Sequence, residues 1–219
     1  MLPRVLEPEV MDSEWEANDY DAMDHRQVNG VFVSDFLKLW GGFGAILDVG
    51  AGTVQIPLEL CRQHSTATVL AIDAAANMLK VAQRNVLAAG LDDRIRLQLC
   101  DAKHVPYADG SFLAVMSNSI VHHIPEPRAV VTEMVRVVRS GGLLFVRDLL
   151  RPDDDAAVRR LVAQYAGAAN PHQQRMFDDS LRAALTLDEV RALILPLGFA
   201  ADTVRATSDR HWTWSAYKP

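Results

Sequence analysis

Short apolar runs recur through the middle of the chain, and several of them are continuous and rich in β-branched residues. They are Ala45–Val49, Thr68–Ile72, Ile95–Leu99, Phe112–Met116 and Leu143–Val146. Because successive positions in these runs are apolar, both faces of each strand are expected to be buried, which is typical of a parallel sheet covered by helices. The pattern therefore predicts the strands of one buried sheet.

Stretches with helical periodicity separate these runs, over residues 55–64, 75–89 and 127–138. Gly90 follows the second stretch and the pair Gly141-Gly142 follows the third, and a glycine past the last periodic residue is a helix stop signal. Pro127 suits the first turn of a helix. Strands that alternate with helices of this length predict a doubly wound α/β sheet with right-handed crossovers.

Three further pieces lie outside this core, and the last of them is a helix predicted from the capping box Thr186–Glu189, followed by a half-buried strand pattern over residues 212–217. Residues 11–40 begin acidic and aromatic and continue as an apolar helix, so residues 1–42 are predicted to form an N-terminal helical cap. The cap is expected to be part of the same domain as residues 43–219. Residues 151–185 are too long for an ordinary connection, so they are predicted to form a lid insertion over a binding site.

Composition and charge argue against several classes of protein, among them nucleic-acid-binding and membrane-spanning proteins. The chain has 219 residues, of which 49% are hydrophobic, enough for one domain with a substantial core. The net charge of −6 and the lack of a basic cluster argue against a nucleic-acid partner. No apolar run is long enough to span a bilayer, and the first ten residues lack the apolar stretch of a signal peptide, so a cytoplasmic location is predicted. Cys61 and Cys100 lie in apolar segments and are expected to be buried free thiols.

The loop after the first predicted strand carries the sharpest local signal. Its residues run from Asp48 through Gly50 and Gly52 to Gln55. Glycines at the carboxyl end of a strand in an open α/β sheet let backbone N–H groups approach a ligand closely. A dinucleotide site of the Gly-x-Gly-x-x-Gly type needs a third glycine where Gln55 stands, which argues against a nicotinamide or flavin cofactor.

Acidic residues follow three neighbouring strands of the predicted sheet. Asp48, Asp73 and Asp101 all lie near carboxyl ends of strands, so they are expected to converge on one crevice. A carboxylate at the position of Asp73 can accept hydrogen bonds from both hydroxyls of a ribose. Three acids would repel a pyrophosphate but favour a ligand that carries a sulfonium, an ammonium and a ribose. Each acid can also be a surface or helix-capping carboxylate.

Taken together, the ordered motifs of residues 43–150 resemble the class I S-adenosylmethionine-dependent methyltransferases, and most closely the small-molecule branch that includes the ubiquinone and menaquinone methyltransferases. The motifs are the loop 48–53, Asp73 with Asn77-Met78-Leu79, residues 100–112, residues 119–124 and Arg139-Ser140-Gly141-Gly142. The resemblance implies a Rossmann-like, seven-stranded, mostly parallel sheet of order 3-2-1-4-5-7-6 whose last strand is antiparallel. It also implies S-adenosyl-L-methionine as cofactor and S-adenosyl-L-homocysteine as product. Val54 departs from the family, which usually has a third glycine there.

The same resemblance assigns cofactor-binding residues. Beside Asp48 in the crevice, it implies contacts to the methionine portion, the ribose, the adenine and the amino-acid end from Gly50, Ala51, Gly52, Asp73, Ala74, Met78, Asp101, Ala102, Asn118 and Ser119. Tyr20 is the best candidate for an aromatic lid over the cofactor. Met78 is equally well explained as an ordinary core residue, because methionine at helical spacing often packs in the core.

The candidate catalytic residue is His123. In-line methyl transfer depends mainly on holding the nucleophile near the methyl carbon, so a catalytic side chain is not required. If the acceptor loses a proton, His123 can act as its base or orient it, whereas the alternative is a loop histidine bonded to the backbone. No metal is expected, because His122 and His123 lack the i, i+4 spacing of a zinc pair and His172 and His211 are far away in sequence.

Other candidates for the walls of an acceptor pocket lie outside the core, although ordinary surface and packing roles explain each of them too. They are His25, Asn29, Tyr165, His172, Phe177 and Arg182. The predicted function is methyl transfer to a small molecule, with carbon, nitrogen, oxygen and sulfur acceptors and the oligomeric state all left open. Two alternatives are a non-catalytic S-adenosylmethionine-binding protein and an NAD(P)-dependent oxidoreductase. The oxidoreductase is disfavoured by Gln55 and by the lack of a Tyr-x-x-x-Lys pattern.

Overall fold

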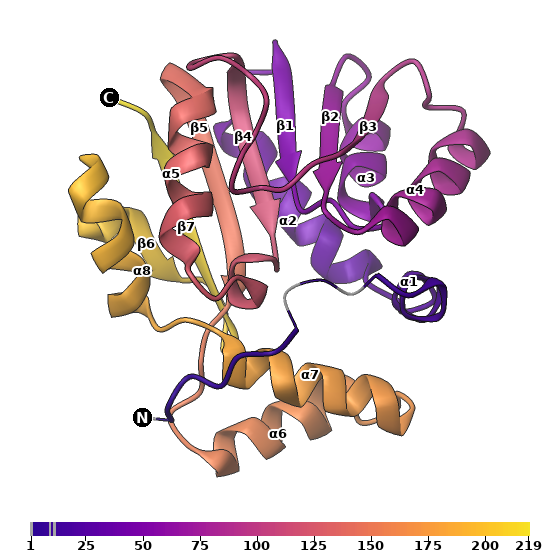
Figure 1. Cartoon of the computed structure of the whole chain (residues 1–219), viewed down its shortest axis with the longest axis vertical. Coiled ribbons are helices and arrows are strands. Elements are labelled where there is room, and N and C mark those ends of the chain that lie inside the picture. The colour runs from indigo at the N-terminus through magenta and orange to yellow at the C-terminus, as the bar shows by residue number, and fades with distance from the viewer. Residues whose placement is uncertain (1, 9, 11) are drawn as a thin grey trace.

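The computed structural model describes residues 2–8, 10 and 12–219, and its centre is one seven-stranded sheet (Figure 1). The strands are β1 (Ala45–Val49), β2 (Thr68–Asp73), β3 (Ile95–Leu99), β4 (Phe112–Asn118), β5 (Val138–Leu149), β6 (Val204–Ala206) and β7 (His211–Tyr217). Their order is β3-β2-β1-β4-β5-β7-β6, and β7 runs antiparallel to both of its neighbours. This arrangement confirms the predicted topology.

Helices cover both faces of the sheet. The α-helices are α1 (Glu14–Asp21), α2 (Arg26–Leu39), α3 (Gln55–Gln63), α4 (Ala76–Ala89), α5 (Pro127–Val137), α6 (Asp155–Ala166), α7 (Pro171–Ala183) and α8 (Leu187–Ile194). Three short 3₁₀ turns are η1 (Val121–His123), η2 (Leu195–Leu197) and η3 (Ala201–Thr203). Buried residues of α2, α3 and α4 pack on one face, and those of α5 and α8 pack on the other.

The central strand β1 is buried on both faces, which explains why its sequence is a continuous apolar run. Ile46 belongs to the core cluster beneath α2 and α3, whereas Leu47 and Val49 belong to the cluster beneath α5 and α8. All three side chains are completely buried. Because successive strand residues point to opposite faces, a strand buried on both faces must be apolar at every position except where it meets a ligand.

The glycine pair before β5 does not have the predicted role. Helix α5 ends at Val137, and β5 begins at once with Val138, so Gly141 and Gly142 lie within the strand instead of ending the helix. Gly141 has φ +74°, and a Cβ on Gly142 would lie 2.8 Å from the carbonyl oxygen of Leu113. The β4–β5 register also shifts here, so the glycines permit a bulge.

Helices α6 and α7 form a hairpin at the carboxyl ends of the parallel strands, and the N-terminal segment runs beside α7 toward α1 (Figure 1). Asn170 caps the start of α7. The α7 residue Gln173 donates through Nε2 to Asp19 Oδ1 of α1 at 3.0 Å. The N-terminal segment, α1 and α7 therefore surround the edge of the sheet where ligands bind in such folds.

The prediction that both cysteines are buried is confirmed for one of them. Cys61 is buried as predicted, but Cys100 is only half-buried because it follows the edge strand β3. Among residues 2–8, 10 and 12–219, no helix combines the length and the apolarity that a bilayer span requires.

Candidate functional site

The loop after β1 turns tightly at its two glycines. Gly50 and Gly52 have φ values of +72° and +54°, in the left-handed region. The N–H groups of Gly50 and Ala51 both donate to the carbonyl oxygen of Ile72, at 2.9 and 3.0 Å. A Cβ on Gly50 would lie 2.1 Å from Cγ2 of Ile120, so no larger residue fits there without displacing the chain after β4. Gly50 therefore permits the close approach of the chains after β1 and β4, and the predicted approach of backbone N–H groups to a ligand stays a prediction.

Val54, which departs from the resembled family, ends this loop as the residue before α3. Its φ is +61°, and its side chain is completely buried in the core cluster beneath α2 and α3. A β-branched residue is rare in the left-handed region because its side chain crowds the backbone. The backbone therefore explains why glycine is usual at this position, and burial of the valine side chain offsets part of the strain.

Asp73 joins the first two loops of the site. Its Oδ2 accepts a hydrogen bond from Gly52 N at 2.7 Å, and its Oδ1 accepts one from Ala75 N at 2.8 Å. A carboxylate has about four lone-pair positions, so each oxygen can accept one more hydrogen bond. Burial raises the pKa of Asp73, although the two backbone donors oppose that shift. The group is held in place with acceptor capacity left, as ribose binding requires.

Asp48 lies beneath the site and does not line its cavity. Its side chain is 2% exposed in the middle of the sheet. Burial, with a smaller contribution from the charge of Asp73, raises its pKa to about 8. Of the three acids expected to converge on the crevice, Asp73 and Asp101 line the cavity, whereas Asp48 is buried in the sheet beneath it.

One cavity at the carboxyl edge collects most of the predicted residues. Those that line it are Tyr20, Gly50, Gly52, Asp73, Ala74, Met78, Asp101, Ala102, Asn118, Ser119 and His123. Ala51 lies in the same loop but, like Asp48, is not part of the lining. Five further residues line the cavity and were not predicted to bind the cofactor: Val10, Ala75, Cys100, Ile120 and Ile124.

Tyr20 of α1 covers the glycine loop. A Cβ on Gly52 would lie 3.7 Å from the Cε1 atom of Tyr20, so the ring is in van der Waals range of that backbone. Burial raises the pKa of Tyr20 to about 12, and the charges of Asp73, Asp21 and Asp48 add to the shift. Its phenol is therefore neutral and forms a partly apolar roof beside the acidic floor.

The chain turns sharply after β4. Ser119 has φ +58°, and Asn118 Nδ2 donates to Ser119 Oγ at 3.1 Å. Non-glycine residues in strained conformations occur often at ligand sites. At the opposite end of the cavity, Lys103 N donates to Asp101 Oδ1 at 2.9 Å, and the Lys103 ammonium lies 3.1 Å from the same oxygen. Burial alone would raise the pKa of Asp101, but Lys103 holds it below its usual value.

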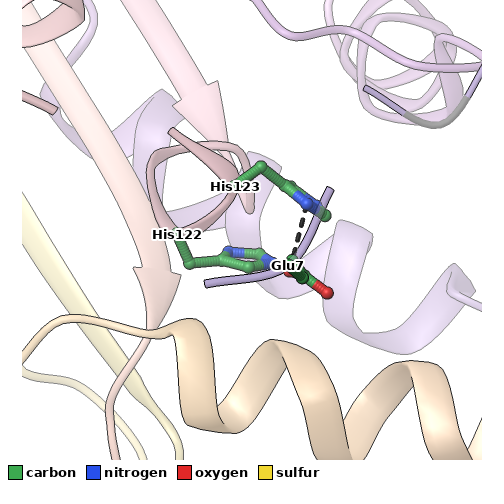
Figure 2. A group of neighbouring side chains, drawn as sticks. All are labelled: Glu7, His122 and His123. Carbon is green, nitrogen blue, oxygen red and sulfur yellow. Dashed lines mark ion pairs between the residues drawn. The ribbon is translucent and has the colours of Figure 1, made fainter. Parts of the chain in front are cut away.

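The two histidines of η1 have different surroundings. His122 is buried, and its Nδ1 lies 2.5 Å from Asp148 Oδ1. His123 lines the cavity, and its Nδ1 lies 3.0 Å from Glu7 Oε1 (Figure 2). No local pattern in the sequence pointed to Glu7, because it comes from the N-terminal segment and reaches η1 only through the tertiary fold.

The remaining lid candidates lie outside the cavity. His25 and Asn29 border a separate hollow beside α3. Tyr165 donates to Asp209 at 2.7 Å, Phe177 packs against the α6–α7 core, and Arg182 pairs with Asp155 and Asp178. The ring of His172 packs against Trp15 of α1 at 4.4 Å between centroids. These contacts close the hairpin and join it to α1, and a lid function for the hairpin stays a prediction.

Comparisons with known proteins agree with this geometry. Residues 47–146 match the family described as "Methyltransferase domain". Similar curated proteins include methyltransferase GfsG of Streptomyces halstedii, 39% identical over 48% of this chain, and a demethylmenaquinone methyltransferase of Desulfitobacterium hafniense, 32% identical over 49%. The chain spans 37% and 43% of the lengths of these two relatives.

Solved structures extend the likeness to the whole fold. The crystal structure of an S-adenosyl-L-methionine-dependent methyltransferase from Methanococcus maripaludis superposes with a TM-score of 0.74. The superposition covers 98% of this chain and 97% of the other chain at 16% sequence identity. At that identity the comparison supports the fold and leaves the chemistry to the residues of the site.

Proposed function

We propose that this chain is a class I S-adenosylmethionine-dependent methyltransferase, which binds S-adenosyl-L-methionine and transfers the methyl group to a small molecule; the match of residues 47–146 to a methyltransferase domain and the shared fold support this. The observation that carries the proposal is the gathering of Gly50, Gly52, Asp73 and Asp101 around one cavity at the carboxyl edge of the sheet. These residues come from three successive strand ends, which is where this type of fold binds nucleosides.

The side chains fit such a cofactor in charge and shape. Asp73 retains acceptor capacity for the ribose hydroxyls after binding Gly52 N and Ala75 N. Met78 and Ala74 offer apolar surface to the adenine, with Asp101 and Ala102 at its edge. The sulfonium and ammonium charges suit a cavity with acidic groups in its floor and wall and a neutral Tyr20 above.

Positioning and exclusion of water are the main contributions expected from the chain. The sulfonium of the cofactor supplies an activated methyl group, so the protein must hold the acceptor in line with it. Tyr20 and the N-terminal segment cover the cavity, and Val10, Ile120 and Ile124 give it apolar walls. These walls favour an acceptor with an apolar portion. His123 is the candidate that receives or orients the acceptor proton.

Calorimetry with S-adenosylhomocysteine tests the cofactor assignment. We expect stoichiometric binding to the wild type and at least a tenfold loss for Asp73→Ala, because the ribose loses its charged acceptor. Asp92→Ala is the matched control, since Asp92 is an exposed acid after α4. Equal affinity in all three proteins would refute the ribose assignment, and no binding to the folded wild type would refute the cofactor.

A second assay separates catalysis from binding alone. Incubation with S-adenosylmethionine and a panel of hydroxyl, amine, thiol and quinol acceptors should yield S-adenosylhomocysteine with at least one acceptor. Cofactor binding without product from any acceptor would favour the non-catalytic alternative. The single-domain organisation, with a cap over 1–42 and a lid over 151–185, is part of this proposal, and the cytoplasmic location stays a prediction.

A further inference from the structure

Three potential metal ligands meet beside the cavity, from two segments far apart in the sequence. Glu7 of the N-terminal segment faces His122 and His123 of η1 (Figure 2). Glu7 Oε1 lies 3.4 Å from His122 Nε2 and 3.0 Å from His123 Nδ1. The ligand atoms of all three residues lie within 4.8 Å of one another. The side chains of Glu7 and His122 are 12% and 3% exposed, so this is an enclosed cluster.

The two separations from the Glu7 carboxylate are close to those around a small metal ion. Bonds of about 2.1 Å from zinc to nitrogen or oxygen place neighbouring ligands of a tetrahedron about 3.4 Å apart. The two distances from Glu7 Oε1 are close to that value. Although His123 Nδ1 is buried and close to Glu7, it forms no well-aligned hydrogen bond. In the tautomer that carries its proton on Nε2, this nitrogen can therefore bind a ligand between the residues.

A second carboxylate orients His122 as metal-binding histidines are usually oriented. Asp148 Oδ1 lies 2.5 Å from His122 Nδ1, which leaves Nε2 to face Glu7. Asp148 is itself fixed by hydrogen bonds from the N–H groups of Val121 at 2.6 Å and Leu149 at 2.6 Å. A carboxylate behind the ligating imidazole fixes its tautomer and strengthens its basicity toward a metal.

We propose that Glu7, His122 and His123 bind one divalent first-row transition metal ion, of which Zn²⁺ is a representative. Two imidazoles and one carboxylate suit Zn²⁺ and Fe²⁺ and disfavour Mg²⁺, which prefers oxygen ligands. Metal binding goes beyond the proposed methyl transfer and meets it only at His123, where the consequence for the acceptor rests on that proposed function. The metal ties the N-terminal segment to the cavity wall. With Nδ1 bound to the metal, His123 carries its proton on Nε2, so it orients an acceptor by donating a hydrogen bond and does not act as a base.

Zinc titration of the metal-free full chain tests the site directly. A competition titration against a chromophoric chelator should show one equivalent bound, and Co²⁺ in its place should give the intense visible absorption of a four-coordinate ion. We expect Glu7→Gln and, separately, His123→Asn each to weaken binding at least tenfold. Circular dichroism will establish that both variants are folded, which is expected because neither residue lies in the sheet.

The matched control is Glu59→Gln, since Glu59 forms a surface pair with Arg62 on α3 and lies outside the proposed site. Its zinc affinity should equal that of the wild type, and Mg²⁺ should not compete. No saturable binding by the wild type, or binding that survives both Glu7→Gln and His123→Asn, would overturn the proposal. S-adenosylhomocysteine binding measured with and without zinc keeps this outcome distinct from a failure of the methyltransferase assignment.

Discussion

The carboxyl edge of the sheet is built differently on its two sides. On the β1–β2 side, the loop of Gly50 and Gly52 and the carboxylate of Asp73 are joined by hydrogen bonds between neighbouring strand ends. On the β4 side, the His123 side chain of η1 pairs with Glu7, which belongs to the N-terminal segment, more than 100 residues away in the sequence. One side is formed by neighbouring strand ends, whereas the other requires the N-terminal segment to lie against η1.

The two sides correspond to the two proposed ligands, with the cofactor on the β1–β2 side and the acceptor on the β4 side. The β1–β2 side holds the residues proposed to bind the ribose and methionine portions of S-adenosylmethionine, and hydrogen bonds between its loops fix their backbone. The β4 side holds His123, the proposed contact to the acceptor, and is covered by the N-terminal segment. Loops carried on a rigid scaffold are where specificity usually resides. Substitutions on the two sides should therefore fail in different ways.

The largest effect is expected from Gly50→Ala. The new Cβ would lie 2.1 Å from Ile120 Cγ2 and 2.9 Å from Ile120 Cβ, so the branch point of that side chain must move. Left-handed strain and overpacking together should lower the free energy of unfolding by about 4 kcal/mol. S-adenosylhomocysteine binding should be lost as well. Chemical denaturation and calorimetry will measure both effects.

Gly30→Ala is the matched control for that substitution. Gly30 lies within α2, and a Cβ there would meet no atom within 4 Å. Alanine in a helix interior should raise stability by about 0.5–1 kcal/mol and leave cofactor binding unchanged. A Gly50→Ala protein as stable as Gly30→Ala would contradict the close approach of β1 and β4 loops described above.

The next effect is a pH dependence from Asp48. Its pKa is raised to about 8 in the folded protein by burial, so it keeps a proton that the unfolded chain has lost. Stability from this group is therefore present at low pH and lost as pH rises through about 4 to 8. Relative to the wild type, Asp48→Asn should become more stable by about 3 kcal/mol between pH 5 and pH 8. Urea unfolding at several pH values gives this difference, and parallel curves would contradict the buried acid.

The contrast between the two sides also explains how far sequence alone could go. The strands were predictable because burial on both faces requires a continuous run of apolar residues. The loop after β1 was predictable because positive φ angles favour glycine at Gly50 and Gly52. The prediction that Gly141-Gly142 end a helix was wrong, because a glycine can also permit a bulge within a strand. Glu7 and Val10 were missed because their places depend on tertiary docking, for which neighbouring residues carry no pattern.

Docking of the N-terminal segment can be broken by Arg4→Met. Arg4 Nε donates to the carbonyl oxygen of Ala183 at 2.7 Å, and Arg4 Nη2 donates to those of His122 and Ile124 at 3.0 and 2.9 Å. Losing these charged hydrogen bonds should cost about 2 kcal/mol. Limited proteolysis should then cut the N-terminal segment faster, while the β1–β2 side keeps its structure.

Arg26→Met is the control for charge removal, because the Arg26 side chain is 91% exposed in its pair with Asp24. Its stability should change by less than about 0.5 kcal/mol. Equal proteolysis rates for Arg4→Met and the wild type would mean that the segment is held by other contacts, and that the β4 side does not depend on this arginine.

The smallest predicted effect, on the β1–β2 side, comes from comparing Val54→Gly with Val54→Ala. Both lose the buried valine side chain, so the difference between them isolates the backbone at φ +61°. Glycine should be more stable than alanine here by about 1 kcal/mol, because the left-handed conformation costs an L-residue about that much. At Val81, a buried position of α4, the order should reverse, with alanine more stable by a similar amount. Urea unfolding of the four variants measures both differences, and the same order at both positions would show that Val54 is not strained.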